Sequence, residues 1–127
     1  MRYLNRQLIT TVSFYDAHES FYHGFLLALL GACADWQVSS NAETGRGRSD
    51  IIAEREDGSL GFVVEVKQVR DPRKLDEACD AAMRQIEEKD YTAVLRRFGV
   101  AEIWMYGIAF CDKRCRVVAK RGEADPV

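Results

Sequence analysis

The sequence predicts a single α/β domain, residues 1–127, in which one helix, three strands, a second helix and two strands follow one another. A chain of 127 residues fits one hydrophobic core, since single domains most often hold about 100–150 residues. The composition, 47% hydrophobic and 30% charged with 2 Pro, is that of a globular protein. It excludes collagen-like, low-complexity and disordered chains. We expect residues 1–12 to form an approach segment and 122–127 a loose tail.

The first part of the chain is expected to form a buried helix and a short strand. Residues from about Ala17 to Ala34 carry apolar side chains around most of the helix circumference, which is typical of a helix buried on more than one side. The alternation in residues 36–40 predicts a short strand. Gly-Arg-Gly-Arg at 45–48 then predicts a loop with two arginines suited to phosphate.

A β-hairpin is the clearest local prediction. Residues 50–55 and 60–69 are apolar strand candidates on either side of Asp57-Gly58, and Asp-Gly between such runs is the strongest short-range hairpin signal. If Asp57 and Gly58 form a two-residue turn, Glu56 pairs with Ser59. Asp50 then lies directly across from Glu65.

The second half of the chain predicts another helix and two more strands. Asp71-Pro72 gives a capping residue followed by proline at the first helical position, and the helix should run to about Asp90. Residues 91–97 either continue this helix or form a second one broken near Asp90, with Gly99 as the end signal. Residues 101–110 predict a central strand, and 114–119 a further strand after a tight turn.

The charge balance gives no overall basic field. The formal net charge is −2, which excludes nonspecific attraction of the whole chain to nucleic acid. Residues 92–121, however, hold seven Lys and Arg against two Asp and Glu, a balance of +5. This region is either an ordinary solvated surface or a phosphate-facing patch, and the two interpretations have equal weight.

Cysteine spacing and hydropathy exclude several other classes. The four cysteines show no CxxC pair, so neither a disulfide scaffold nor a zinc site is expected. The chain has no signal-peptide pattern, and its longest apolar run, Phe25 to Leu30, is far too short to span a bilayer. We expect a soluble cytoplasmic protein without a membrane partner.

Asp50, Glu65 and Lys67 form the candidate chemical site. Two opposed carboxylates repel each other unless a cation or a proton lies between them, and Lys67 shares the face of Glu65 because strand side chains alternate. Oxygen ligands without His or Cys favour Mg²⁺ or Mn²⁺ over zinc. The alternative from spacing alone is an ordinary Glu–Lys pair on an exposed strand face.

Several short segments occur in an order that resembles a known family. They are Glu19 to Phe25, Ser39-Ser40-Asn41, Gly47 to Asp50, Glu65-Val66-Lys67, Gln85 to Tyr91 and Tyr106 to Phe110. Together they resemble the PD-(D/E)XK nuclease superfamily, and more closely the nuclease-like domain that follows an AAA-ATPase-like domain in many bacterial proteins. Ser49 stands where the superfamily name places proline.

The resemblance implies a restriction-endonuclease-like αβββαβ core with a mixed central sheet flanked by helices. It also implies Mg²⁺-dependent hydrolysis of phosphodiester bonds, in DNA rather than RNA. Asp50 and Glu65 would hold the metal, and Lys67 would be the catalytic lysine. Glu19 on the first helix would be a further acidic group, and Gln85 on the second a supporting polar one.

The expected partners follow from the same interpretation. Arg46 and Arg48, in the loop beside the expected metal, are candidates for substrate binding. Nucleic acid is the expected partner, and an AAA-ATPase-like domain or partner and a second copy of the chain are further candidates. The rival hypothesis is a non-catalytic nuclease-like module for binding nucleic acid or protein, because fold alone does not establish function.

Overall fold

The computed structural model describes residues 19–40 and 50–122. Its elements in chain order are α2 (Glu19–Gly31), β1 (Trp36–Ser40), β2 (Asp50–Arg55), β3 (Leu60–Gln68), the 3₁₀ turn η2 (Pro72–Lys74), α3 (Leu75–Lys89), α4 (Ala93–Arg97), β4 (Glu102–Cys111) and β5 (Arg114–Arg121). The predicted approach segment, the loop at 45–48 and nearly all of the predicted tail lie outside the described residues. None of the described helices is long and apolar enough to cross a membrane.

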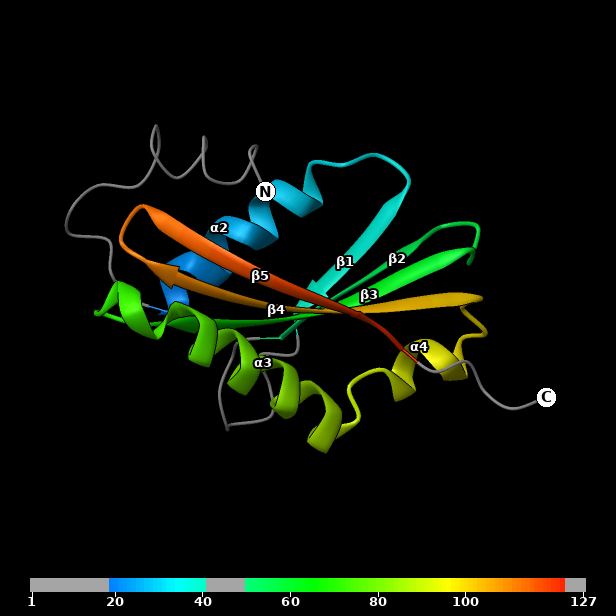
Figure 1. Cartoon of the computed structure of the whole chain (residues 1–127). Coiled ribbons are helices and arrows are strands. Elements are labelled where there is room, and N and C mark those ends of the chain that lie inside the picture. Colours follow the sequence, from blue (N-terminus) through cyan, green and yellow to red (C-terminus); the bar gives the residue numbers. More distant parts are fainter. Residues whose placement is uncertain (1–18, 41–49, 123–127) are drawn as a thin grey trace.

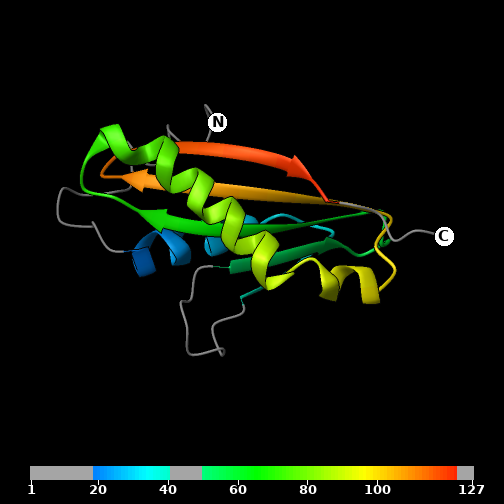
Figure 2. The same cartoon turned by 60° about the horizontal axis from the view of Figure 1, so that its bottom comes forward.

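The strands form one mixed sheet in the order β1-β2-β3-β4-β5. Strands β3 and β4 are parallel, and the three other neighbouring pairs are antiparallel. Helix α2 covers one face of the sheet, while α3 and α4 cover the other (Figure 1). Figure 2 shows α3 lying across the strands on its own face. The expected mixed α/β architecture is confirmed.

The β2–β3 hairpin confirms the predicted register but not the predicted turn. Asp50 pairs with Glu65, whereas residues 56–59 form a four-residue loop outside the ladder. The Gly58 amide donates to the Arg55 carbonyl at 2.9 Å, and the Asp57 carboxylate accepts from the amide and the hydroxyl of Ser59. These local bonds keep Glu56 and Ser59 out of the ladder, so the two-residue turn with its Glu56–Ser59 pair was wrong. The strand ends at the turn, Arg55 and Leu60, and the register are as predicted.

The helices of the second half begin and end differently from the simplest prediction. Asp71 caps the 3₁₀ turn η2, with its carboxylate accepting from the Arg73 amide, and α3 starts only at Leu75. Asp90 ends α3 in the left-handed conformation with φ 49°. The next segment is therefore a separate helix, α4, rather than a continuation of α3. The first helix ends at Gly31, within the range from Gly31 to Asp35 where its end is expected.

The two faces of the sheet have separate hydrophobic cores. On the α2 face, the Tyr22 ring stacks on Phe110 with centroids 4.4 Å apart, and the Tyr22 hydroxyl donates to the Asp112 carbonyl at 2.7 Å. The buried residues of this core are Tyr22, Leu26, Ile51, Val64, Val66, Ile108 and Phe110. On the other face, α3 and α4 pack on Val63, Ile103 and Met105, and the start of α3 packs on Ala109 and Cys111.

Candidate active site

Glu65 and Lys67 lie on the α3 face of β3, near its C-terminal end. Their neighbours Val64 and Val66 point into the α2 core, and successive side chains of a strand point to opposite faces. The Glu65 side chain is fully buried, and the Lys67 side chain is 26% exposed. An ordinary surface pair on an exposed strand face, the alternative from spacing alone, is therefore wrong.

Lys67 is held between β3 and α3. Its ammonium Nζ donates to Gln85 Oε1 at 2.6 Å and lies 3.7 Å from Glu65 Oε1. Gln85 lies in the second half of α3, so the bond joins the helix to the strand that it covers. Hydrogen bonds from a charged donor are stronger than neutral ones, and this one fixes the ammonium beside a buried carboxylate.

Asp50 occupies the predicted position in the ladder. It is the first residue of β2, and its Cα partner is Glu65; its side chain lies outside the described set. Among the described side chains, no three of His, Cys, Asp and Glu come together. The carboxylate oxygens that Glu65 offers are hard ligands, and ligands of this kind fit Mg²⁺ or Mn²⁺.

Gly107 allows α3 to approach the sheet beside Glu65. It is the β4 partner of Glu65, and a Cβ added there would lie 2.7 Å from the Cys79 carbonyl oxygen and 3.2 Å from Ala82 Cβ. Only glycine permits this separation, so Gly107 determines how closely α3 carries Gln85 to Lys67. This role of Gly107 was not predicted from the sequence. The signal was a lone glycine inside a bulky strand, which often marks a close backbone approach.

The side chains of Glu19, Arg46 and Arg48, the other predicted site residues, lie outside the described set. Glu19 is the first residue of α2, the helix that covers the opposite face of the sheet (Figure 1). Tyr91 packs against the core beneath α3 and α4, where it is partly buried.

Most cations of residues 92–121 take part in ion pairs. The pairs are Arg96–Asp90 at 2.7 Å, Arg116–Asp76 at 3.3 Å, Lys120–Glu87 at 2.6 Å and Arg121–Glu102 at 3.6 Å. Two of the four acids, Asp76 and Glu87, belong to α3. Because each pair reduces the positive field that reaches solvent, the structure favours a solvated surface over a continuous phosphate-facing patch.

Burial keeps the cysteine thiols of the second half neutral at physiological pH. It raises the pKa of Cys115 to about 11 and also raises the pKa values of Cys79 and Cys111. All four cysteines are free thiols, and Cys33 is the exposed one. Since the thiolate is the nucleophile and the metal ligand, these three thiols are suited to neither role at physiological pH.

The comparisons with known proteins agree with the segments quoted from the sequence. The PD-(D/E)XK nuclease superfamily matches the chain over residues 17–120, a range that includes every described element except the last residue of β5. Comparison with curated proteins and with solved structures gave no significant match. The association with an AAA-ATPase-like domain stays a prediction.

Proposed function

Since the chain belongs to the PD-(D/E)XK nuclease superfamily, we propose that it is a metal-dependent nuclease that hydrolyses phosphodiester bonds, in DNA rather than RNA. Nucleases of this superfamily typically use divalent metals. The observation that carries the proposal is the buried Glu65 carboxylate with the Lys67 ammonium at 3.7 Å. Burial of such a pair is costly and contributes little to stability, which favours a chemical role.

Asp50 and Glu65 are the residues that would hold the metal, either Mg²⁺ or Mn²⁺. When bound, the ion lowers the pKa of a coordinated water and neutralises charge on the phosphate that is attacked. Glu65 contributes a carboxylate that burial keeps from bulk water. Asp50 contributes the second carboxylate from the facing position of the ladder.

Lys67 supplies a positive charge, and Gln85 orients the ammonium group that carries it. The ammonium of Lys67 has three donors, and Gln85 Oε1 accepts from this group at 2.6 Å. The remaining donors are suited to hold a phosphate oxygen, where negative charge builds up in the transition state. Gln85 acts through Lys67 and is therefore a positioning residue.

The direct test is a metal-titrated cleavage assay on plasmid, linear duplex, single-stranded DNA and RNA. We expect wild type to cleave DNA with Mg²⁺ or Mn²⁺. Lys67→Gln should reduce cleavage about a hundredfold or more, the usual effect of removing one donor to a developing charge. Lys113→Gln, at an exposed lysine in the β4–β5 turn, is the matched control and should cleave like wild type.

Two outcomes of this assay contradict the proposal. Equal cleavage by Lys67→Gln and wild type, with equal unfolding midpoints, places the activity elsewhere or in a contaminant. No cleavage of any substrate at any metal concentration, with binding of nucleic acid retained, supports the rival hypothesis of a non-catalytic module. Addition of an AAA-ATPase-like partner to the same assay tests whether cleavage depends on it.

A further inference from the structure

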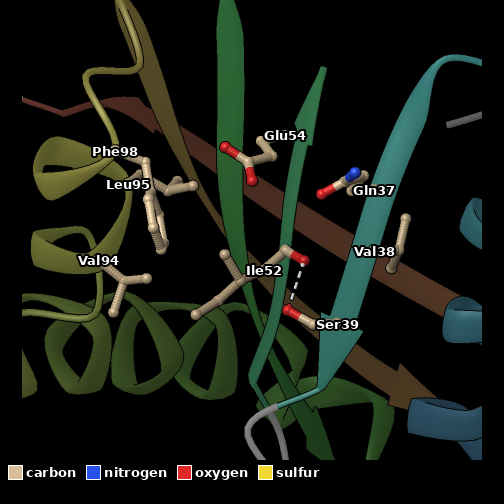
Figure 3. A pocket seen from close by; sticks show the side chains of 8 residues that line it. All are labelled: Gln37, Val38, Ser39, Ile52, Glu54, Val94, Leu95 and Phe98. Atoms are coloured by element: carbon tan, nitrogen blue, oxygen red, sulfur yellow. Dashed lines mark hydrogen bonds between the residues drawn. The ribbon is translucent and has the colours of Figure 1, made fainter. Parts of the chain in front are cut away.

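An open groove lies between α4 and the β1–β2 edge of the sheet. Its volume is about 400 Å³, within the usual range of small-ligand sites. The residues that line it include Gln37 of β1, Ile52 and Glu54 of β2, Val94 and Leu95 of α4, and Phe98 just after α4. Figure 3 shows the α4 side chains facing those of β1 and β2. Phe98 is 71% exposed and Val94 40%, so apolar surface stands open to solvent at one wall.

The groove begins beside the candidate active site. Ile52 on its floor pairs with Val63, and Val63 lies two residues before Glu65 on the same face of β3. At a strand rise of about 3.4 Å per residue, the two positions are roughly 7 Å apart along the strand. A single strand stacked at about 3.4 Å per nucleotide would cover this distance with roughly two nucleotides.

Glu54 on the floor of the groove and Arg97 on α4 favour an orientation in which the base of such a strand enters the groove and its phosphates stay outside. Glu54 lines the floor, and its carboxylate repels phosphate but accepts hydrogen bonds from base amino groups. Arg97 is exposed on α4 and shares a helix face with Val94, three residues earlier. The groove therefore suits a base, with the sugar-phosphate backbone outside near Arg97.

We propose that this groove binds an unpaired base of a single-stranded nucleic-acid substrate, with Phe98 as the stacking surface. The inference rests on the proposed nuclease function and narrows its substrate to single strands or single-stranded ends. The flat, exposed ring of Phe98 offers a face to any base, and such stacking tolerates sequence. A paired duplex has no free base to place between α4 and β2.

The test measures binding without cleavage, in EDTA and low salt. Fluorescence anisotropy follows a labelled oligodeoxyadenosine single strand, whose bases carry amino groups, and its duplex with oligothymidine. We expect wild type to bind the single strand more tightly. Phe98→Ala should weaken single-strand binding roughly tenfold to a hundredfold and leave duplex binding unchanged. Phe98→Trp should restore the affinity, while Phe98→Leu, which is apolar without a ring, should not.

A second experiment tests whether the phosphate backbone of the single strand contacts Arg97. Arg97→Gln should make the slope of log K against log salt shallower by about 0.7, the loss of one phosphate contact on a single strand. Lys113→Gln, remote from the groove, should leave the slope unchanged, and equal effects of the two variants would overturn the placement of the backbone. The base site is also overturned if Phe98→Leu binds like wild type.

Two further readouts separate this inference from its alternatives. If Phe98→Ala converts a dimer to a monomer in sedimentation without weakening single-strand binding, the groove is a contact between copies and the inference is wrong. If wild type binds single strands through Phe98 but cleaves nothing with metal, the nuclease function fails while the base site stands. If wild type cleaves and binds only duplex, the base site fails and the nuclease function stands.

Discussion

The two faces of β3 carry opposite kinds of side chain. Val64 and Val66 point into the α2 core with the stacked rings of Tyr22 and Phe110. Glu65 and Lys67 alternate with these valines along β3 and point toward α3 and Gln85. One face gains stability from apolar burial. The other buries a charged pair whose desolvation offsets most of its attraction. We therefore expect substitutions at Val64 and Val66 to act on stability and those at Glu65 and Lys67 to act on function.

The largest expected effect on stability is on the α2 face. Phe110→Ala should lower the free energy of unfolding by about 3–5 kcal/mol, the usual cost of emptying a buried phenylalanine site, because Phe110 is fully buried. Urea denaturation measures the change. Phe98→Ala is the matched control, since Phe98 is 71% exposed and should change stability by only about 0.5 kcal/mol. Similar losses in both variants would contradict a core centred on the Tyr22–Phe110 stack.

An intermediate effect is expected where α3 meets the sheet. Gly107→Ala should cost about 1–3 kcal/mol of unfolding free energy, as overpacking does, because the new Cβ would meet the Cys79 carbonyl at 2.7 Å. Displacement of α3 should also withdraw Gln85 from Lys67 and reduce cleavage.

The control for this variant is Gly61→Ala on β3. Its added Cβ would lie 3.1 Å from side-chain atoms of Leu95 and Val100 and 3.2 Å from the Ala53 carbonyl oxygen. We expect Gly61→Ala to retain cleavage at a similar loss of stability. If both variants lose cleavage in proportion to their stability, Gly107 does not position the site.

The smallest effect should come from the surface pair that joins α3 to α4. The hydrogen bond from Arg96, at 2.7 Å, lowers the pKa of Asp90 from its ordinary value of 3.8. The pair's contribution, about 0.2–1 kcal/mol for an exposed ion pair, is present above pH 3.8 and is lost as pH falls through the lower folded-state value.

Asp90→Asn removes this contribution and keeps a residue that tolerates the left-handed conformation at 90. Urea midpoints of wild type and variant should therefore differ at pH 7 and converge as the pH falls through the lowered pKa of Asp90. A difference that persists in acid would mean that Asp90 acts through the backbone of the turn rather than through its charge.

The sequence predicted the part of the site that depends on local pairing. Asp57-Gly58 and the alternation on either side were enough for the register that places Asp50 across from Glu65. The length of the turn was not predictable, because the four-residue loop leaves the same register as a two-residue turn would. Burial of Glu65 could not be predicted either, since it depends on the parallel pairing of β3 with β4 and on the cover by α3.

The contact between Lys67 and Gln85 could not be predicted from local sequence patterns either. The two residues are 18 positions apart, and pattern alone gave no reason to join them; only the family resemblance named Gln85. The separation of α3 from the sheet depends on Gly107, whose role requires the three-dimensional packing of β4 under Cys79. The groove beside α4 likewise combines residues of β1, β2 and α4 that no local motif connects.

We expect the ladder position shared by Asp50 and Glu65 to bind a divalent metal, and thermal unfolding with added Mn²⁺ measures this binding. A ligand that binds only the folded state raises its stability, by about 2.7 kcal/mol at a hundred times the dissociation constant. The melting temperature of wild type should rise with Mn²⁺, whereas Asp50→Asn and Glu65→Gln should show no rise. Phe98→Ala, outside the site, should respond like wild type. An equal rise in wild type and both carboxylate variants would contradict the account.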